Sequence, residues 1–236
     1  SSLVVLASGA AILSPATKSR LAELLPDRVI VDGFGSSETG TLGNKSGAET
    51  RSFRVNEQTA VLDDAFRPVV PGSGAIGRLA RRGHIPLRYH RDPKKSAETF
   101  ITIDGVRWSL PGDLATVEAD GTVVLLGRGS TCINTGGEKV FPEEVEGVLK
   151  AHPAVVDAVV AGAPDERWGE RVVAVVAVRS GTAVALDEIQ AFCRERLAGY
   201  KVPRALVVVP EVLRSPAGKA DYRWALERAA ESANSA

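Results

Sequence analysis

Apolar residues in the first forty positions form two short runs, Leu3–Leu6 and Val29–Val31. Ser14 and Pro15 between them form an N-cap followed by a first-turn proline, which predicts a helix up to about Leu25. The glycine-rich polar stretch from Asp32 to Gly40 follows the second run directly. A strand, a helix, a strand and a polar loop together predict an α/β layer with a ligand site at the carboxyl ends of its strands.

The pattern changes between Phe53 and about Leu126 to short alternating stretches broken by turn signals such as Asp104-Gly105 and Asp120-Gly121. Such regular spacing of turns predicts a small antiparallel sheet or β-barrel. The polar run from Gly127 to Ser130 then interrupts the pattern. We therefore expect a domain boundary there, with domains at 1–127 and 128–236.

Helical and apolar strand patterns alternate after this boundary. A capping-box-like pair, Asp187 and Gln190, is expected to start one of the helices. The expected elements are helix 142–150, strands 155–160 and 172–178, a helix from 187, strand 207–209 and helix 221–231. The fold class predicted for the chain is thus α/β with a small β-barrel subdomain, followed by a compact α+β domain.

Composition and net charge exclude some classes of protein. The 236 residues carry 29 basic and 29 acidic side chains, with 44% hydrophobic and 25% charged residues, which is typical of a folded soluble protein. The zero net charge argues against a nucleic-acid binder, and arginines 78, 81, 82, 88 and 91 are interpreted as a solvated face. No apolar run is long enough for a transmembrane helix. The chain has no Met and starts within an expected strand, which predicts a fragment.

The two cysteines, Cys132 and Cys193, lack the spacing of a zinc site or a disulfide framework. A reducing, cytoplasmic compartment is therefore expected.

The stretch from Asp32 to Gly40 combines features of a phosphate site. Glycines let a backbone approach a ligand closely, Ser36 and Ser37 can donate hydrogen bonds to phosphate oxygens, and Glu38 can hold Mg²⁺. The alternative is an ordinary hairpin or loop tip without a ligand.

Other candidate residues follow later in the chain. Asp113 lies in a turn after Gly112, where a carboxylate can accept both hydroxyls of a ribose, and Arg128 can reach a sugar or phosphate. Gly136 and Gly137 predict a tight hairpin, and Lys219 lies on a loop with Pro216 and Gly218. Each also has a simpler interpretation, as a turn residue or a solvated lysine.

The order of these motifs resembles the adenylate-forming acyl-CoA synthetase family, from Ser8 to Lys219. Four segments carry the resemblance: Gly33–Glu38, Trp108–Asp113, Gly127–Glu146 and Ser215–Lys219. The resemblance implies that ATP and a carboxylic acid form an acyl-adenylate and pyrophosphate, and that coenzyme A then displaces AMP. It identifies this chain as the end of the large domain and the whole mobile C-terminal domain.

The resemblance also implies roles for individual residues. Lys219 is the expected catalytic residue, because it would stabilise charge as the carboxylate attacks the α-phosphate. Glu38 would bind Mg²⁺. Gly136, Gly137 and Glu138 would border the path of coenzyme A. The expected ATP and AMP site comprises Gly9, Ala10, Ala11, Asp32, Gly33, Phe34, Gly35, Ser36, Ser37, Asp113 and Arg128.

The sequence departs from the family pattern in a few places. Phe34 stands where Tyr is usual, Ser37 where Thr is usual, and Thr131 where the hinge commonly has Asp. The family's loop for the β- and γ-phosphates would lie upstream, in the missing N-terminal part, so the 236-residue chain by itself is expected to be inactive.

The sequence of the hinge and hairpin segment, Gly127–Glu146, is similar to that of actinobacterial members of the family that act on fatty acids or steroid side-chain acids. The competing hypothesis is a non-catalytic nucleotide-binding or regulatory module that shares the C-terminal fold.

Overall fold

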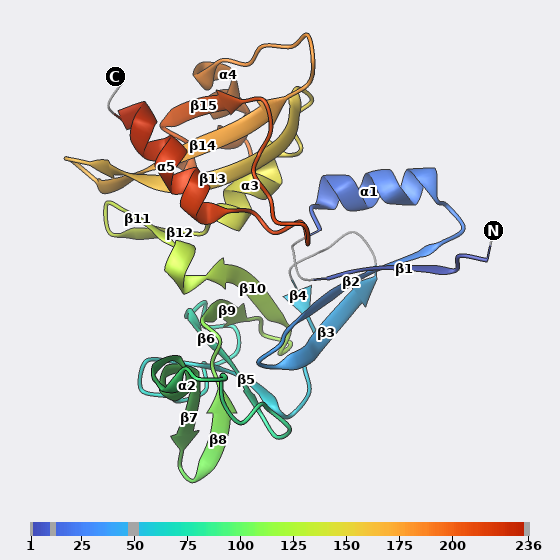
Figure 1. Ribbon diagram of the computed structural model, residues 1–236, viewed down its shortest axis with the longest axis vertical. Coiled ribbons are helices and arrows are strands. Elements are labelled where there is room, and N and C mark those ends of the chain that lie inside the picture. The colour runs from blue at the N-terminus through green and yellow to red at the C-terminus, as the bar shows by residue number, and fades with distance from the viewer. Residues whose placement is uncertain (1, 10–12, 47–51, 234–236) are drawn as a thin grey trace. The chain divides into compact units, whose positions relative to one another are not determined.

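The computed structural model describes residues 2–9, 13–46 and 52–233. The chain folds into two compact units, one of residues 1–13 and 17–130 and the other of residues 14–16 and 131–236. Figure 1 gives the order of the elements along each unit. Each unit is described by itself below.

The first unit begins with the expected strand–helix–strand arrangement. Its elements are β1 (Val5–Ser8), α1 (Pro15–Leu24), β2 (Val29–Ser36) and β3 (Gly40–Ser46). β1 pairs with β2 in parallel, and β3 pairs with the other edge of β2 in antiparallel orientation. The predicted α/β layer is therefore confirmed in this segment.

The prediction of a long polar loop from Asp32 to Gly40 is wrong. β2 continues through the glycines to Ser36, and only Ser37–Thr39 form a turn before β3 starts at Gly40. A register shift between Phe34 and Gly35 accommodates the pairing. Backbone hydrogen bonding to β3 outweighs the low strand propensity of glycine here, so the stretch forms a β-hairpin with β3.

The middle of the chain is an antiparallel sheet. Its strands are β4 (Ser52–Phe53), β5 (Thr59–Leu62), β6 (Gly77–Arg82), β7 (Phe100–Ile103), β8 (Val106–Ser109), β9 (Asp113–Val117) and β10 (Val123–Arg128). Among the described residues, these seven strands follow the order β4-β10-β9-β6-β8-β7, and β5 pairs with β6.

A small antiparallel sheet or a β-barrel was expected here, and the described strands form an antiparallel sheet that does not close into a barrel. No pairing within residues 52–128 joins β4 to β7, the two ends of the sheet order. The described part of β4 has two residues, which pair with β10. The helix α2 (Pro93–Thr99) precedes β7, and the side chain of Asp92 caps it by accepting a hydrogen bond from the Lys95 N–H.

The second unit alternates strands and helices. Its elements are η1 (Gly129–Thr131) at the junction, β11 (Ile133–Thr135), β12 (Glu138–Val140), α3 (Pro142–Leu149), β13 (Val155–Asp165), β14 (Gly169–Val178), α4 (Leu186–Arg194), η2 (Gly199–Lys201), β15 (Ala205–Val209) and α5 (Tyr222–Ala233). In the described part of this unit the sheet has five strands: β12-β11-β14-β13 in order, with β15 parallel to β14.

Both faces of this sheet are buried, which explains the near-continuous apolar runs of β13 and β14. Successive side chains of a strand point to opposite faces. Val172, Ala174 and Val176 of β14 pack with α3 and α4, whereas Val173 and Val175 pack with α5. Helices therefore cover the sheet on both sides (Figure 1).

The capping box predicted at Asp187 and Gln190 is wrong. The N-cap of α4 is Ala185, which makes no side-chain hydrogen bond, and the Asp187 carboxylate accepts only from the Glu188 N–H. Burial of Ile189 and Cys193 against the sheet stabilises this helix instead.

None of the helices within the described residues has the length and apolar character needed to cross a membrane.

Candidate functional site

The β2–β3 hairpin depends on glycines where backbones approach closely. A Cβ atom at Gly35 would overlap the Gly40 carbonyl oxygen and lie 3.0 Å from the Thr41 Cα. A Cβ at Gly33 would lie 3.3 Å from the Ser8 carbonyl oxygen, at the end of the adjacent strand. Any larger residue at Gly35 would push the two strands of the hairpin apart.

The turn after β2 is held by hydroxyl groups. The Thr39 hydroxyl accepts a hydrogen bond from the Ser36 N–H at 3.1 Å and lies 3.0 Å from the Ser36 hydroxyl. It also donates to the Gly40 carbonyl oxygen at 3.0 Å. Thr39, which sequence reasoning did not assign, is therefore the residue that shapes the turn presenting Ser37 and Glu38.

Glu38 is fixed by Tyr89. The Tyr89 hydroxyl donates to Glu38 Oε1 at 2.6 Å. Partial burial raises the pKa of Glu38, but hydrogen bonds from Tyr89, its own backbone and Ser36, together with the charge of Arg128, lower it below its usual value. The carboxylate is thus held anionic and oriented.

Tyr89 is itself anchored by the segment that carries α2. Its N–H donates to the Ser96 hydroxyl at 2.9 Å, and its ring lies 5.5 Å from the Phe100 ring. The Lys95 ammonium lies 4.3 Å from the centre of the Tyr89 ring. The sequence signalled Tyr89 only as an aromatic residue within a basic run, and its link to Glu38 spans 51 positions.

Asp113 and Arg128 meet across the β9–β10 pair, where they are direct partners in the register. Arg128 Nε lies 3.5 Å from Asp113 Oδ1, and the side chains are 56% and 10% exposed, respectively. Burial raises the pKa of Asp113, while the charge and hydrogen bond of Arg128 oppose that shift. The charge of Glu38 also acts on Asp113, so the structure brings the three predicted residues together from three segments.

The other residues predicted at the nucleotide site lie in different environments. Asp32 is 3% exposed, and burial raises the pKa of its carboxyl group against the charge of Lys18. The Phe34 ring packs on Phe53 with a centroid distance of 5.3 Å, within the core of this unit. Gly9 lies after β1, and an added Cβ there would be in van der Waals contact with the Gly33 carbonyl oxygen at 3.7 Å. Ala10 and Ala11 lie outside the described residues.

Lys219 lies on an exposed loop of the second unit, between β15 and α5. The Gly218 N–H donates to the Ser215 carbonyl oxygen at 2.8 Å, and the Ser215 N–H donates to the Lys219 carbonyl oxygen at 2.9 Å. Gly218 has φ = 77°, which glycine adopts readily. The loop is a short closed turn that presents the Lys219 side chain to solvent within its unit.

Gly136 and Gly137 form the expected two-residue hairpin between β11 and β12, with φ values of 61° and 87°. The two positions differ in their surroundings. A Cβ at Gly136 would lie 2.7 Å from Cε3 of Trp168, whereas nothing lies within 4 Å of a Cβ at Gly137. Glu138, the first residue of β12, is exposed.

Comparison with known proteins finds a family match within the second unit. Residues 144–219 match the AMP-binding enzyme C-terminal domain. The matched segment lies within the second unit. It contains most of α3, the β13–β14 pair, α4 and the Lys219 loop.

The similarity to known proteins extends beyond this domain. The chain is 55% identical, over 97% of its length, to 3-oxocholest-4-en-26-oate–CoA ligase of Rhodococcus rhodochrous. It is 56% identical, also over 97% of its length, to a medium/long-chain-fatty-acid–CoA/3-oxocholest-4-en-26-oate–CoA ligase of Mycobacterium tuberculosis. The chain spans only 42% and 43% of the lengths of these relatives.

Solved structures support the same relationship. An anthranilate CoA ligase in complex with anthranoyl-AMP superimposes with a TM-score of 0.84 at 27% identity, over 98% of this chain and 45% of that one. ATP-bound MatB from Rhodopseudomonas palustris gives a TM-score of 0.80 at 25% identity, over 94% of this chain and 45% of that one.

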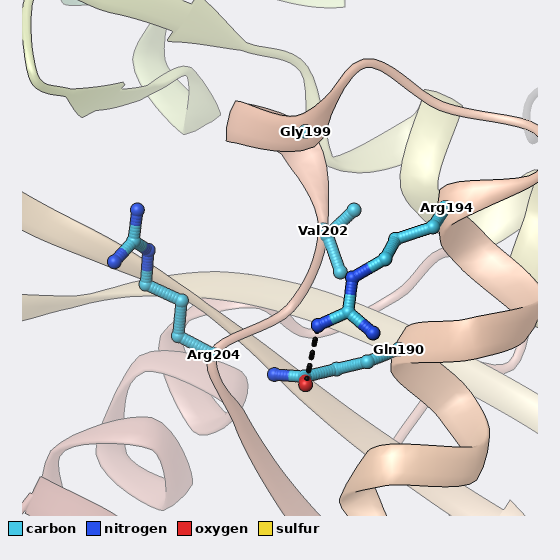
Figure 2. Close-up of a pocket in the computed structure, with 5 residues that line it drawn as sticks. All are labelled: Gln190, Arg194, Gly199, Val202 and Arg204. Carbon is cyan, nitrogen blue, oxygen red and sulfur yellow. Dashed lines mark hydrogen bonds between the residues drawn. The ribbon is translucent and has the colours of Figure 1, made fainter.

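The second unit also carries a shallow groove of about 260 Å³ that sequence reasoning missed. Figure 2 shows its lining: Gln190 and Arg194 from α4, Gly199 and Val202 at η2, and Arg204 just before β15. Arg194 Nη2 donates to Gln190 Oε1 at 2.9 Å. Arg194 and Arg204 bring cationic side chains to the groove from separate segments, and the Arg204 guanidinium points away from Arg194 and packs over the Trp168 ring at 4.6 Å (Figure 2).

Proposed function

We propose that this chain is the C-terminal portion of an AMP-forming acyl-CoA synthetase. The observation that carries the proposal is the 55% identity to a CoA ligase along 97% of the chain, well beyond the C-terminal domain itself. In the first step a carboxylate oxygen attacks the α-phosphorus of ATP and pyrophosphate leaves. In the second step the thiol sulfur of coenzyme A attacks the acyl carbonyl, loses its proton, and AMP leaves.

We assign the ribose and phosphates of ATP to the first unit. Asp113 lies at the start of β9 with a largely buried carboxylate, which suits bidentate acceptance from two ribose hydroxyls. Arg128 is close enough to neutralise both Asp113 and an approaching phosphate. Support for this assignment comes from their pairing across adjacent strands. The backbone of Asp32–Gly35 and of Gly9, with Ala10 and Ala11, would border the base.

Glu38 is proposed as a ligand of Mg²⁺. The residues fit the ion: the carboxylate is kept anionic and its orientation is fixed by Tyr89. Mg²⁺ commonly binds through one or two carboxylates together with substrate phosphates. The ion would supply charge neutralisation on the ATP phosphates. Ser36 and Ser37 lie beside Glu38 and would donate hydrogen bonds to the same phosphates.

Lys219 is proposed to stabilise the negative charge that develops at the α-phosphate during adenylation. Its ammonium group is a permanent cation on a loop whose internal hydrogen bonds limit its motion. A positioned charge that acts only on the transition state raises the rate of the first step.

Coenzyme A is assigned to the second unit. The hairpin at Gly136 and Gly137, with Glu138 beside it, leaves open space over Gly137 that suits the narrow pantetheine chain. The groove with Arg194 and Arg204 offers guanidinium groups for the phosphates of coenzyme A. The acyl substrate is proposed to be a hydrophobic carboxylic acid, of the fatty-acid or steroid side-chain type named for the relatives.

The decisive experiment replaces Lys219 by Ala in the full-length enzyme and measures the two half-reactions separately. Pyrophosphate release reports adenylation, and thioester formation from supplied acyl-adenylate reports the second step. We expect adenylation to fall by about 10²- to 10³-fold, the usual cost of removing one preorganised charge, and the second step to change little.

The matched control is Arg223→Ala, which removes another exposed cation from the same unit, 91% exposed on α5. It should leave both half-reactions unchanged. Equal losses of both steps in Lys219→Ala would make Lys219 structural. No adenylation by the wild-type enzyme with any acid would favour the competing hypothesis of a non-catalytic nucleotide-binding module.

A further inference from the structure

The loop from Ser215 to Lys219 is closed by its own hydrogen bonds. Besides the two backbone bonds described above, the Lys219 N–H donates to the Ser215 hydroxyl at 3.2 Å. Arg214 and Ala220 form an isolated antiparallel bridge at its base. These bonds define the shape of the loop, but they connect it only to itself. Val212 and Ala220 on either side of it pack in the apolar core, and the polar contact between the loop and the sheet comes from another residue.

Arg214 provides that contact. Its Nε and Nη2 donate to the two carboxylate oxygens of Asp157 at 2.6 and 2.7 Å. Its Nη1 donates to the carbonyl oxygen of Gly218, the residue before Lys219, at 3.0 Å. A guanidinium group is planar and rigid, so these three bonds fix the Gly218 carbonyl relative to β13.

The Asp157 end of this link is itself held in place. Its carboxylate also accepts from the Ala158 N–H at 2.8 Å, and Lys150 of the α3 C-cap approaches to 3.5 Å. Asp157 and Arg214 are 25% and 26% exposed, so the pair is largely shielded from water. Burial raises the pKa of Asp157, but the hydrogen bonds of Arg214 and the charge of Lys150 lower it below its usual value.

We propose that Asp157 and Arg214 are positioning residues for Lys219. The guanidinium group of Arg214 ties the Lys219 loop to β13, so that the lysine meets the α-phosphate with a defined direction during adenylation. This inference rests on the proposed role of Lys219. Neither residue touches the reacting atoms, and the second half-reaction does not depend on the link.

The sharpest variant is Arg214→Lys. Lysine keeps the positive charge next to Asp157, but a single ammonium on a flexible chain cannot hold both carboxylate oxygens and the Gly218 carbonyl in one plane. Asp157→Asn is the second variant, because it removes the charge at the other end of the link and leaves Arg214 intact.

The matched control is Glu144→Gln. Glu144 accepts two hydrogen bonds from Lys201, both at 2.7 Å, and the pair is 32% and 18% exposed, so it resembles the Asp157–Arg214 pair in geometry and burial. It lies in the same unit, and its ion pair joins α3 to η2 rather than to the Lys219 loop. A general loss of stability would affect the control and the test variants alike.

The first readout needs no catalysis and uses the 236-residue chain. Amide hydrogen exchange of residues 215–219, followed by mass spectrometry, should become at least about tenfold faster in Arg214→Lys and Asp157→Asn and stay unchanged in Glu144→Gln. Equal exchange in all three variants, at comparable melting temperatures, would overturn the proposal.

The second readout is adenylation by the full-length enzyme. Arg214→Lys should lower its rate up to about 10²-fold, the scale expected for a reacting group displaced by about 1 Å, with the KM for ATP unchanged. In a Lys219→Ala background, Arg214→Lys should have almost no further effect, because the group that it positions is gone.

The outcomes separate the two proposals. If Lys219→Ala is harmless but the loop exchanges faster in Arg214→Lys, the role of Lys219 fails and the link between Arg214 and the loop stands. If Lys219→Ala blocks adenylation and Arg214→Lys changes neither exchange nor rate, the positioning role is refuted. Additive losses in the double variant would also refute it.

Discussion

Two adjacent glycines offer a test of how far packing, rather than backbone conformation alone, constrains the hairpin between β11 and β12. Gly136 and Gly137 both have positive φ, at 61° and 87°. Only Gly136 is covered: its added Cβ would lie 2.7 Å from Trp168 Cε3, and its N–H donates to the Trp168 carbonyl oxygen at 2.8 Å. We compare Gly136→Ala with Gly137→Ala.

The backbone cost is similar for the two substitutions. An L-residue in the left-handed region costs about 1–2 kcal/mol, and the smaller entropy of the unfolded alanine chain returns about 0.4–1 kcal/mol. Gly136→Ala must also displace the Trp168 ring, which Arg167 and Arg204 flank at 4.7 and 4.6 Å. Overpacking of this kind costs about 1–3 kcal/mol. Gly136→Ala should therefore be the less stable variant by about that amount.

Scanning calorimetry of the two variants measures this difference. For a domain of about a hundred residues, 1 kcal/mol corresponds to roughly 4–8 °C, so the transition of the second unit should melt at least about 4 °C lower in Gly136→Ala than in Gly137→Ala. Gly137→Asn serves as control, because Asn tolerates positive φ and should melt near the wild type. Equal melting temperatures for the two alanine variants would refute the packing argument.

Two further predictions concern carboxylates. Tyr89→Phe removes the hydroxyl that donates a hydrogen bond to Glu38 at 2.6 Å. Because this bond favours the ionised carboxylate, the pKa of Glu38 should rise in the variant. A carboxyl ¹³C NMR titration that shows no rise would contradict this prediction. Glu146 is 6% exposed, and burial raises its pKa despite hydrogen bonds from the Val160 N–H and the Tyr222 hydroxyl. Its contribution to stability is complete below the unfolded pKa of about 4.3 and is lost as pH rises through the folded pKa. The stability of Glu146→Gln relative to wild type, measured by urea unfolding, should therefore rise as pH increases above about 4.3. A difference that does not depend on pH would refute this.

Local signals in the sequence determined most elements of the second unit. The apolar runs in β13 and β14 and the helical pattern at 142–150 predicted their elements correctly, because burial against the sheet acts on the residues of each element themselves. Gly136 and Gly137 predicted the hairpin correctly, because glycine itself readily adopts the positive φ values that this turn requires. Local chemistry was enough at these positions.

Local signals failed where a distant segment supplied the stabilising contact. The stretch from Asp32 to Ser36 contains two glycines and looked like a loop, but pairing with β3 makes it a strand. The capping box at Asp187 is absent because packing of α4 on the sheet defines that helix without it.

The side-chain contacts of the candidate site were decided by the tertiary structure alone. Tyr89 reaches Glu38 across 51 positions, and Arg214 reaches Asp157 across 57. Such contacts depend on how segments distant in the sequence pack together, and not on the few residues around each group. The sequence by itself therefore indicated which residues carry chemistry, and only the fold determined which side chains orient them.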